Sequence, residues 1–402
     1  MAVKRKIVKS TFGSATVRRR DRGRESQNRL ALTAPQTGGA KAPESDALPA
    51  QLSDGRVGTV TLKDIAIDLG LSFVTVSKVL RNIDDVSDKT RLLVLQRAKA
   101  LNYQPNPSAR ALATGRTRIV GLVVPDLLHT YFAQIAKSLA RTLLKKGYFL
   151  TILVSEEDPD LEREIVDHLL AWRPDALIIA SAAKYSEDIA RIQRHGTPLL
   201  LIDRCFPDLA TNYIGADNEV VGALATEHLI SMGCKRIAHL RGPEISPGTG
   251  RMNGYLQALD KHGMRLPANF VSAMKIAGVP SREQGAVLMR RLLGRGRVPD
   301  GVFCYNDPVA AGAIKAALEA GLRVPEDVAI VGVGNVHYSD LLRVPLSTID
   351  QSSSEIGERA ADLLSECMDA KTPPPPRRIL ITPRLVVRDS TLRRNVTLLK
   401  ES

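Results

Sequence analysis

Residues 60–81, VTLKDIAIDLGLSFVTVSKVLR, constrain the fold of this chain more than any other stretch. Thr61 and Asp64 form the capping-box pattern that starts a helix, and apolar residues follow at helical spacing. Gly70 tolerates the positive φ of a sharp turn, and Ser72 is a suitable N-cap for a second helix. Two short helices joined in this way are typical of a helix-turn-helix, whose second helix enters the DNA major groove. The alternative is an ordinary helix pair inside a core.

A third helix is predicted directly after this unit, over DKTRLLVLQRAKALNY. Ser87 can cap this helix, and Pro105 ends it because proline disfavours helix at the preceding residue. The segment NPSARALATGRTR follows as a short amphipathic stretch that ends at Gly115. The apolar residues of the third helix that are expected to pack on the two short helices are Leu92, Leu95, Ala98 and Leu101.

The positive charge of the chain is concentrated in its first 118 residues. The whole sequence has a formal net charge of +13, of which residues 1–58 carry +7 and residues 59–118 carry +5. The remainder is therefore nearly neutral, at +1. A basic segment joined to a neutral body is typical of a polyanion-binding head on a separate domain.

Residues 1–58 are predicted to form a disordered basic tail. They are rich in Arg, Ser, Gly, Ala and Pro, show no sustained period, and contain one aromatic residue, Phe12. The run RRRDRGR either contacts phosphates or forms part of a solvated tail. A second alternative is that translation of the native protein starts later, at Val57 or Val60.

From Arg118 onward, continuous apolar runs alternate with helical stretches. The runs are IVGLVVPD, FLTILVSE, ALIIAS, PLLLID, RIAHLRG, GVFCYND and VAIVGVGN. Apolar strands separated by helices are typical of parallel sheets that helices cover on both faces. Roughly ten strands are more than one sheet usually holds, so two α/β lobes are predicted. Several runs end in polar residues, which act either as ligand contacts at the carboxyl ends of strands or as simple helix caps.

The remaining composition excludes several classes of protein. No apolar run approaches the roughly 20 residues of a membrane helix, and the N-terminus lacks the apolar region of a secretory signal. The four scattered cysteines are expected to be buried free thiols of a cytoplasmic protein. The sequence contains no nucleophile elbow, P-loop or H-E-x-x-H, and the seven histidines show no metal spacing. No enzyme activity, metal site or cofactor is therefore predicted.

The motifs VTLKDIA, TVSKVL, VSDKTR, LNYQPN and ARALATGRT occur in the order and spacing of one known family. Over about residues 59–392 the chain resembles the LacI/GalR family of bacterial transcription repressors. The resemblance implies an N-terminal all-α helix-turn-helix head plus an α/β two-lobed periplasmic-binding-protein-like core with parallel sheets, joined by three crossovers. The implied segments are the tail 1–58, the head 59–104, the hinge helix and linker 105–118, the core 119–392 and the tail 393–402.

Within that core, the N-lobe is expected at about 119–216 and 344–372, and the C-lobe at about 217–343 and 377–392. For the head and hinge, the resemblance implies DNA contacts by residues of three kinds. Hydroxyl groups or helix-end amides would bind phosphates, the outer face of the second helix would face the groove, and the hinge would hold the DNA backbone and wedge into the minor groove. These residues are Thr61, Ser72, Phe73, Val74, Thr75, Ser77, Lys78, Ser87, Thr90, Tyr103, Asn106, Ala109 and Leu112.

Two of these roles agree with elementary chemistry. Lys78 can donate to guanine O6 and N7, and Val74 can contact a thymine methyl group. The resemblance further implies that two hinge helices of a dimer enter the minor groove, where Leu112 unstacks the central base step and small residues such as Ala109 permit close approach. The alternative for Leu112 is ordinary apolar packing of a linker helix.

The resemblance also implies an effector site between the lobes. The matching residues are Asp126, Tyr131, Phe132, Asp203, Arg251, Asn306, Asp307 and Asn335. Tyr131 and Phe132 either stack on a ligand or pack between the lobes. Many family members carry an aspartate where this chain has Gly334, so either a sugar held by that carboxylate is disfavoured or Asn335 replaces it.

The sequence therefore predicts a cytoplasmic, ligand-responsive, sequence-specific DNA-binding regulator that represses transcription. It would bind a near-palindromic double-stranded operator as a homodimer or larger homo-oligomer, with a carbohydrate or related metabolite as effector and no membrane partner. An activator of the same fold and an effector-independent, sequence-neutral DNA-binding protein are the alternatives. The second alternative does not explain a two-lobed core.

Overall fold

The computed structural model describes residues 60–183, 185–265, 269–274, 281–294 and 298–393. The chain divides between Gln104 and Pro105 into two compact units. The predicted tail 1–58 and all but the first residue of the predicted tail 393–402 lie outside the described residues. Within the described residues, no helix has the length and apolar character that a bilayer crossing requires.

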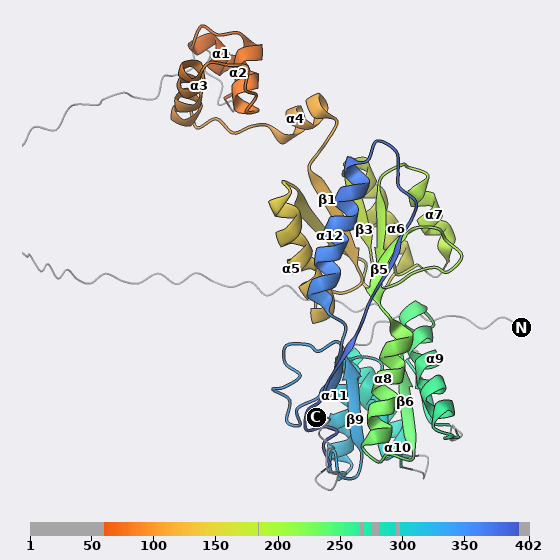
Figure 1. The fold of residues 1–402 in the computed structure, drawn as a ribbon. Coiled ribbons are helices and arrows are strands. Elements are labelled where there is room, and N and C mark those ends of the chain that lie inside the picture. The colour runs from red at the N-terminus through yellow and green to blue at the C-terminus, as the bar shows by residue number, and fades with distance from the viewer. Residues whose placement is uncertain (1–59, 184, 266–268, 275–280, 295–297, 394–402) are drawn as a thin grey trace, which may run out of the picture. The chain divides into compact units, whose positions relative to one another are not determined.

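In the described part of the first unit, residues 60–104, the chain forms three helices, α1 (Leu62–Asp68), α2 (Phe73–Leu80) and α3 (Asp88–Ala100), which Figure 1 shows in orange and brown. The predicted capping box is present, because Thr61 and Asp64 exchange hydrogen bonds at the start of α1. Gly70 takes the positive φ of 63° that the turn between α1 and α2 requires. The predicted helix-turn-helix is therefore confirmed.

The core of this unit differs from the prediction in α3. Val94 and Ala98 of α3 are buried, whereas Leu92 and Leu95 are 59% and 46% exposed. The expectation that Leu92 and Leu95 point inward is wrong, because a strict three-residue spacing rotates by about 60° per step around a helix of 3.6 residues per turn. From the other two helices the core takes Ile65, Ala66, Val76 and Val79.

The second unit begins with helix α4 (Pro107–Thr114) and continues into two lobes, each built on a six-stranded sheet. The sheet of the N-lobe has the order β11-β5-β4-β3-β1-β2, and that of the C-lobe has the order β12-β10-β9-β8-β6-β7. Among the described residues, the strand pairs are parallel except for β10–β12. The predicted architecture of two parallel α/β lobes is confirmed.

In the N-lobe, α5 and α12 cover one face of the sheet and α6 and α7 cover the other (Figure 1). Their apolar side chains pack on strands that are buried on both faces, which is why the strands read as continuous apolar runs. The elements are β1 (Ile119–Val124), α5 (Thr130–Lys145), β2 (Phe149–Val154), α6 (Pro159–Ala171), β3 (Ala176–Ile179), α7 (Ser186–Gln193), β4 (Leu199–Ile202), β5 (Asn212–Ala216), α12 (Ser353–Asp369) and β11 (Arg378–Ile381).

In the C-lobe, α10 and α11 cover one face of the sheet and α8 and α9 cover the other. Cys234 and Cys304 are buried in this lobe as predicted, while Cys205 and Cys367 of the N-lobe are partly exposed, and all four are free thiols. The elements are α8 (Asn218–Ser231), β6 (Ile237–Arg241), α9 (Ser246–Lys261), β7 (Val271–Ala273), α10 (Ser281–Leu293), β8 (Gly301–Cys304), α11 (Asp307–Glu319), β9 (Ala329–Val333), β10 (Ser347–Asp350) and β12 (Arg384–Val386).

The chain passes between the lobes three times: after β5, after β10 and after β11. Strand β10 pairs with β9 of the C-lobe, and β11 pairs with β5 of the N-lobe. The predicted assignment of 344–372 to the N-lobe and 377–392 to the C-lobe is therefore wrong for these two strands. Strands of four residues have too short a pattern to indicate which sheet they join.

Candidate nucleic-acid interface and effector cleft

Helix α2 presents its first two residues after the cap to solvent. Ser72 caps α2 by accepting a hydrogen bond from the Thr75 amide at 3.0 Å, and the two hydroxyl groups lie 2.8 Å apart. Because Val76 and Val79 point into the core, the opposite face is left outside the unit. On this face Phe73 and Val74 are 53% and 58% exposed. Ser77 and Lys78 lie at its half-exposed margin.

The N-termini of the three helices all carry the predicted hydroxyl residues. Thr61 caps α1, and Ser87 caps α3 by accepting from the Thr90 amide at 3.3 Å. The Ser87 and Thr90 hydroxyl groups are 2.9 Å apart. Each cap occupies one amide of its first turn and leaves the partial positive charge of the helix end facing outward. These ends can accept phosphate groups.

Lys78 has an ion-pair partner within the same unit. Its ammonium group binds Asp85, which lies in the turn between α2 and α3. Arg91 of α3 braces this turn by donating to the Asn82 side chain at 2.7 Å and to the Ile83 carbonyl at 2.8 Å. Asp85 is therefore presented to Lys78 by a fixed turn.

Helix α4 is short and almost wholly exposed. Asn106 caps it by accepting from the Ser108 amide at 2.9 Å and the Ala109 amide at 3.3 Å. Gly115 ends it in the left-handed conformation. Leu112 is 89% exposed, so its side chain is free for an external partner. In the other unit, Tyr103 packs against the core of the three helices.

Arg251 is buried between two elements of the C-lobe. It donates to the Asn218 side chain at 3.0 Å and to the Tyr305 carbonyl at 2.6 Å, and its guanidinium lies 4.7 Å from the centre of the Tyr305 ring. Gly222 of α8 permits this position, because a Cβ atom there would lie 2.2 Å from the Arg251 carbonyl oxygen. Both partners of Arg251 are neutral, so no direct ion pair with another described residue cancels its positive charge.

Arg251 lies near the carboxyl ends of the N-lobe strands. Burial lowers the pKa of His129. The negative charges of Asp203 and Asp126 act to raise this pKa, and the positive charge of Arg251 acts to lower it. Burial and the negative charge of Asp203 raise the pKa of Tyr131 well above its ordinary value. Tyr131 lies edge to face with the His129 ring, with ring centres 6.2 Å apart, and the charges of Asp126, Asp203 and Arg251 reach this histidine. Phe132 belongs to the N-lobe core and touches Tyr131 edge to face, with ring centres 5.1 Å apart.

Several buried polar atoms at this place have no hydrogen-bond partner among the described residues. They come from β1, β2 and β4 or from the segments that follow these strands, so they share one end of the N-lobe sheet. Each such atom costs about 1–3 kcal/mol while it is unpaired, which a polar ligand can recover. They are His129 Nδ1, Thr130 Oγ1, the Tyr131 hydroxyl, Ser155 Oγ and Arg204 Nε.

The predicted residues of the C-lobe loops have internal partners instead. The buried Asp307 carboxylate accepts from the Thr348 hydroxyl at 2.6 Å, the Val336 amide at 2.9 Å and the Ser339 hydroxyl at 3.0 Å. Asn306 caps α11. Asn335 donates to Asp350 at 3.1 Å and accepts from Arg388 at 2.9 Å, and so links the end of β10 to the segment after β12.

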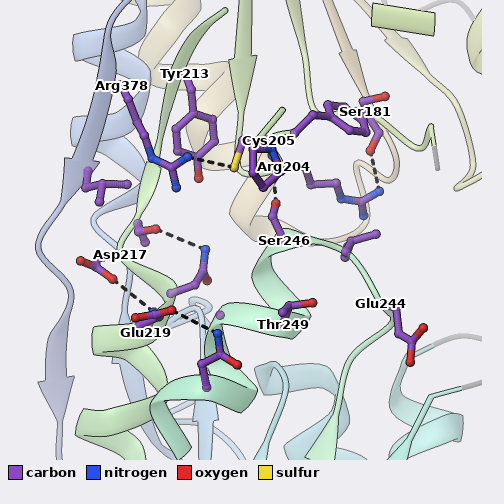
Figure 2. A pocket seen from close by; sticks show the side chains of 18 of the residues that line it. Ser181, Arg204, Cys205, Tyr213, Asp217, Glu219, Glu244, Ser246, Thr249 and Arg378 are labelled. Carbon is purple, nitrogen blue, oxygen red and sulfur yellow. Dashed lines mark hydrogen bonds between the residues drawn. The ribbon is translucent and has the colours of Figure 1, made fainter. Parts of the chain in front are cut away.

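A cavity of about 540 Å³ opens between the lobes beside Arg204 (Figure 2). Its N-lobe wall includes Tyr213 and Arg378, whose guanidinium lies 5.1 Å from the centre of the Tyr213 ring. A hydrogen bond of 2.9 Å from the Cys205 amide to Ser246 Oγ joins the two walls. None of the eight predicted effector residues lines this cavity.

Residues 61–106 match the family described as "Bacterial regulatory proteins, lacI family". Residues 117–389 match the "Periplasmic binding proteins and sugar binding domain of LacI family". The chain belongs to the LacI family of bacterial regulatory proteins. It is accordingly a DNA-binding transcriptional regulator, and the fold expected from the resemblance is confirmed.

Named relatives span nearly the whole head and core of this LacI-family chain. The HTH-type transcriptional repressor PurR of Pasteurella multocida is 33% identical over 82% of this chain and 98% of its own length. The HTH-type transcriptional regulator GalR of Escherichia coli is also 33% identical, over 82% of this chain and 95% of its own.

Solved structures of LacI-family proteins show the same fold. A Lac repressor dimer bound to operator and the anti-inducer ONPF is 27% identical with a TM-score of 0.75, and covers 84% of this chain and 100% of its own. A complex of the transcriptional regulator CelR with cellobiose is 28% identical with a TM-score of 0.63, and covers 82% and 99%.

Sequence reasoning missed several residues of the cleft. Arg204 is not among the predicted effector residues, although it makes a two-point ion pair with Glu157 at 2.6 and 2.8 Å. Burial acts to lower the pKa of Arg204, but Glu157 raises it above its ordinary value. Polar residues directly after apolar runs were the available signal for Arg204. No sequence signal indicated Tyr213 or Arg378, because they face the cavity from within or beside strands.

Proposed function

We propose that this protein represses transcription as a homodimer, by binding a near-palindromic operator under the control of a small-molecule effector. The observation that carries the proposal is the surface of α2. Ser72 caps the helix, its core side is buried, and Phe73 and Val74 are exposed on the side that a recognition helix turns to base edges. Two such heads read the two half-sites of an operator because a dimer has two-fold symmetry.

The hydroxyl residues at the helix ends would fix the head on the DNA backbone. Thr61, Ser72 and Ser87 lie at the N-termini of three helices, where amide groups and the helix dipole favour phosphate. Thr75, Ser77 and Thr90 would add side-chain hydroxyl contacts. Tyr103 would hold the backbone beside the hinge. Such contacts set the register of the head but read no sequence.

Helix α4 would act in the minor groove. The exposed side chain of Leu112 is suited to wedge into a base step, and the small Ala109 lets two such helices approach closely. An isolated helix of eight residues is marginal in water, so α4 gains its stability from DNA and from its dimer partner. Asn106 would contribute by capping this helix. The hinge thereby couples DNA affinity to the state of the core.

The effector would bind between the lobes, at the unpaired polar atoms around His129 and Tyr131. Arg251 from the C-lobe and Asp126 and Asp203 from the N-lobe would hold its polar groups. The CelR complex with cellobiose supports a carbohydrate or related metabolite as the ligand class. Binding that shifts the angle between the lobes would change operator affinity by a coupling free energy of about 1–3 kcal/mol.

In this chain, Asn306, Asp307 and Asn335 would support the cleft rather than touch the ligand, since internal hydrogen bonds occupy them. A binding protein is favoured over an enzyme for a separate reason, because the family consists of transcriptional regulators. A regulator of bacterial DNA would work in the cytoplasm.

The proposal is tested by selecting duplexes from random DNA with the full chain. We expect inverted half-sites and a preference for the selected duplex over mixed-sequence DNA of at least about 1,000-fold. Leu112→Ala should reduce specific affinity far more than non-specific affinity. A preference near one would instead indicate an architectural protein, and equal losses in both affinities would contradict the wedge.

The effector is tested separately by a thermal-shift screen of sugars, sugar acids, nucleobases and phosphorylated metabolites. A ligand at one hundred times its dissociation constant should stabilise the protein by about 2.7 kcal/mol. Arg251→Ala should abolish the shift. A broad screen without any stabilising compound would contradict effector control but leave DNA binding intact.

A further inference from the structure

The exposed surface of α2 is apolar at its first turn. Its two exposed residues, Phe73 and Val74, are apolar and adjacent at the first turn of α2. The core of the head is complete without them, since it is formed by other residues of α1, α2 and α3. Exposed apolar side chains at this position gain stabilisation only when a partner covers them. The apolar feature of a major groove is the 5-methyl group of thymine.

The charged residue of α2 forms an ion pair within the head itself. Lys78 carries the positive charge of this helix, and its ammonium group binds the Asp85 carboxylate. The turn that holds Asp85 is fixed from α3, because Arg91 binds Asn82 and Ile83 within it. The neighbouring acid Asp84 is almost fully exposed and lies 3.4 Å from Arg91, not against Lys78. Asp85 therefore has a place in the structure that Asp84 does not share.

This pairing changes what Lys78 can read. A lysine reads guanine by donating to O6 and N7, and an ammonium group that is held by a carboxylate must leave it first. The carboxylate also cancels the charge that would attract a phosphate. Neither effect weakens apolar contacts with thymine methyl groups.

We propose that α2 reads thymine methyl groups through Phe73 and Val74, while Asp85 withholds Lys78 from guanine. This inference rests on the proposed function, which puts α2 in the major groove. The selected half-sites should therefore carry thymine where Phe73 and Val74 lie.

The first experiment replaces each thymine of the selected duplex, one at a time, by deoxyuridine, which differs only by the missing methyl group. We expect one or two positions in each half-site to lower the affinity of the full chain by about fourfold, the effect of one buried methyl. In Val74→Ala or Phe73→Ala, at least one of these positions should become insensitive. Both residues are exposed, so a thermal melt should show the variants folded as the wild type.

The second experiment compares Asp85→Asn with Asp84→Asn, which change the net charge equally. With Asp85→Asn, the slope of log affinity against log salt should steepen by about one, because Lys78 becomes free for a phosphate. Duplexes with guanine beside the thymine positions should gain several-fold in relative affinity. Asp84→Asn should leave the guanine preference unchanged and affect the salt slope less.

Three results would overturn the inference. Deoxyuridine substitution without effect at every thymine would exclude methyl reading. Equal behaviour of Asp85→Asn and Asp84→Asn would show that Asp85 acts through general electrostatics and not through Lys78. A strong guanine preference of the wild type that Lys78→Gln abolishes would show that Lys78 is not withheld. If no common sequence were selected at all, the proposed function would fail with it.

Discussion

The two lobes treat their buried polar groups at the cleft in opposite ways. The N-lobe residues His129, Thr130, Tyr131, Ser155 and Arg204 each have a buried polar atom without a hydrogen bond among the described residues. At the ends of β8 and β9, the C-lobe satisfies its carboxylate and amide side chains through hydrogen bonds within the lobe. Asp307, Asn306 and Asn335 are the residues concerned.

The difference indicates a division of roles. A face with unpaired polar atoms gains free energy when a polar ligand arrives, whereas a satisfied face keeps its shape whether a ligand is present or not. The contrast is not complete, since His239 and Arg241 of β6 also have an unpaired nitrogen. We therefore expect the N-lobe to supply most polar recognition, and the C-lobe loops to supply a rigid wall that carries Arg251.

The largest effect is expected from Asp307→Ala, which tests whether the C-lobe forms a rigid wall. This change leaves the Thr348 hydroxyl, the Val336 amide and the Ser339 hydroxyl without their acceptor in a buried site, so we expect a loss of about 3 kcal/mol in the free energy of unfolding. Urea unfolding followed by circular dichroism measures it. Asp340→Ala, at an exposed position of the segment that carries Val336 and Ser339, is the control and should change stability little. Similar values for both variants would contradict the wall.

Acid should weaken the C-lobe through His228. Burial lowers the pKa of His228 to about 4, so the unfolded chain, with an ordinary value near 6.5, binds more protons below pH 6.5. The contribution of this histidine is fully present above pH 6.5 and is lost as the pH falls toward 4. Between pH 7 and pH 5, wild type should lose about 2 kcal/mol more than His228→Gln.

Unfolding curves at the two pH values test this prediction. His262→Gln, at an exposed position after α9, serves as the control and should keep the wild-type pH dependence. His239 is also buried, with its pKa lowered to about 3, so part of the acid sensitivity remains in both variants. Identical pH profiles for His228→Gln and wild type would show that His228 is not held neutral by burial.

The head could be predicted from the sequence more fully than the cleft. Thr61 with Asp64, Gly70 and Ser72 act within a few residues, so local spacing is sufficient to place them. α3 shows the limit of such reasoning, because the apolar residues at 92 and 95 suggested an inward face that Val94 and Ala98 occupy.

The cleft depends on contacts between residues far apart in the chain. Asp307 looked like a ligand residue because it follows an apolar run, yet its partners Val336, Ser339 and Thr348 lie 29 to 41 residues away. The predicted lobe of the strands at 347–350 and 378–381 was wrong for the same reason, since pairing with distant strands decides which sheet they join. The unpaired atoms around Tyr131 have no signature in the sequence, because only the complete fold shows what is buried beside them.

The hydrogen bond that joins the N-lobe and the C-lobe at the cavity is tested by Ser246→Ala. The variant removes the acceptor of the Cys205 amide across the lobes, which should cost about 1 kcal/mol. Hydrogen exchange of that amide should become about fivefold faster. Thr249→Ala, another residue that lines the cavity, is the control and should leave this amide unchanged. Unaltered exchange in Ser246→Ala would mean that the lobes stay closed without this hydrogen bond.

The smallest expected effect sharpens the contrast most, because it compares one deleted hydroxyl group in each lobe. Tyr255 in the C-lobe donates its buried hydroxyl to the Ile237 carbonyl at 2.8 Å, so Tyr255→Phe should cost about 1 kcal/mol. Tyr131 in the N-lobe buries a hydroxyl beside the Asp203 carboxylate, but it makes no hydrogen bond of full geometry among the described residues. Tyr131→Phe should therefore change stability by less than about 0.5 kcal/mol or increase it. Thermal and urea unfolding of the two variants make the comparison directly. A loss with Tyr131→Phe as large as that with Tyr255→Phe would show that both lobes satisfy their buried hydroxyls, and the division between a recognising face and a rigid wall would fail.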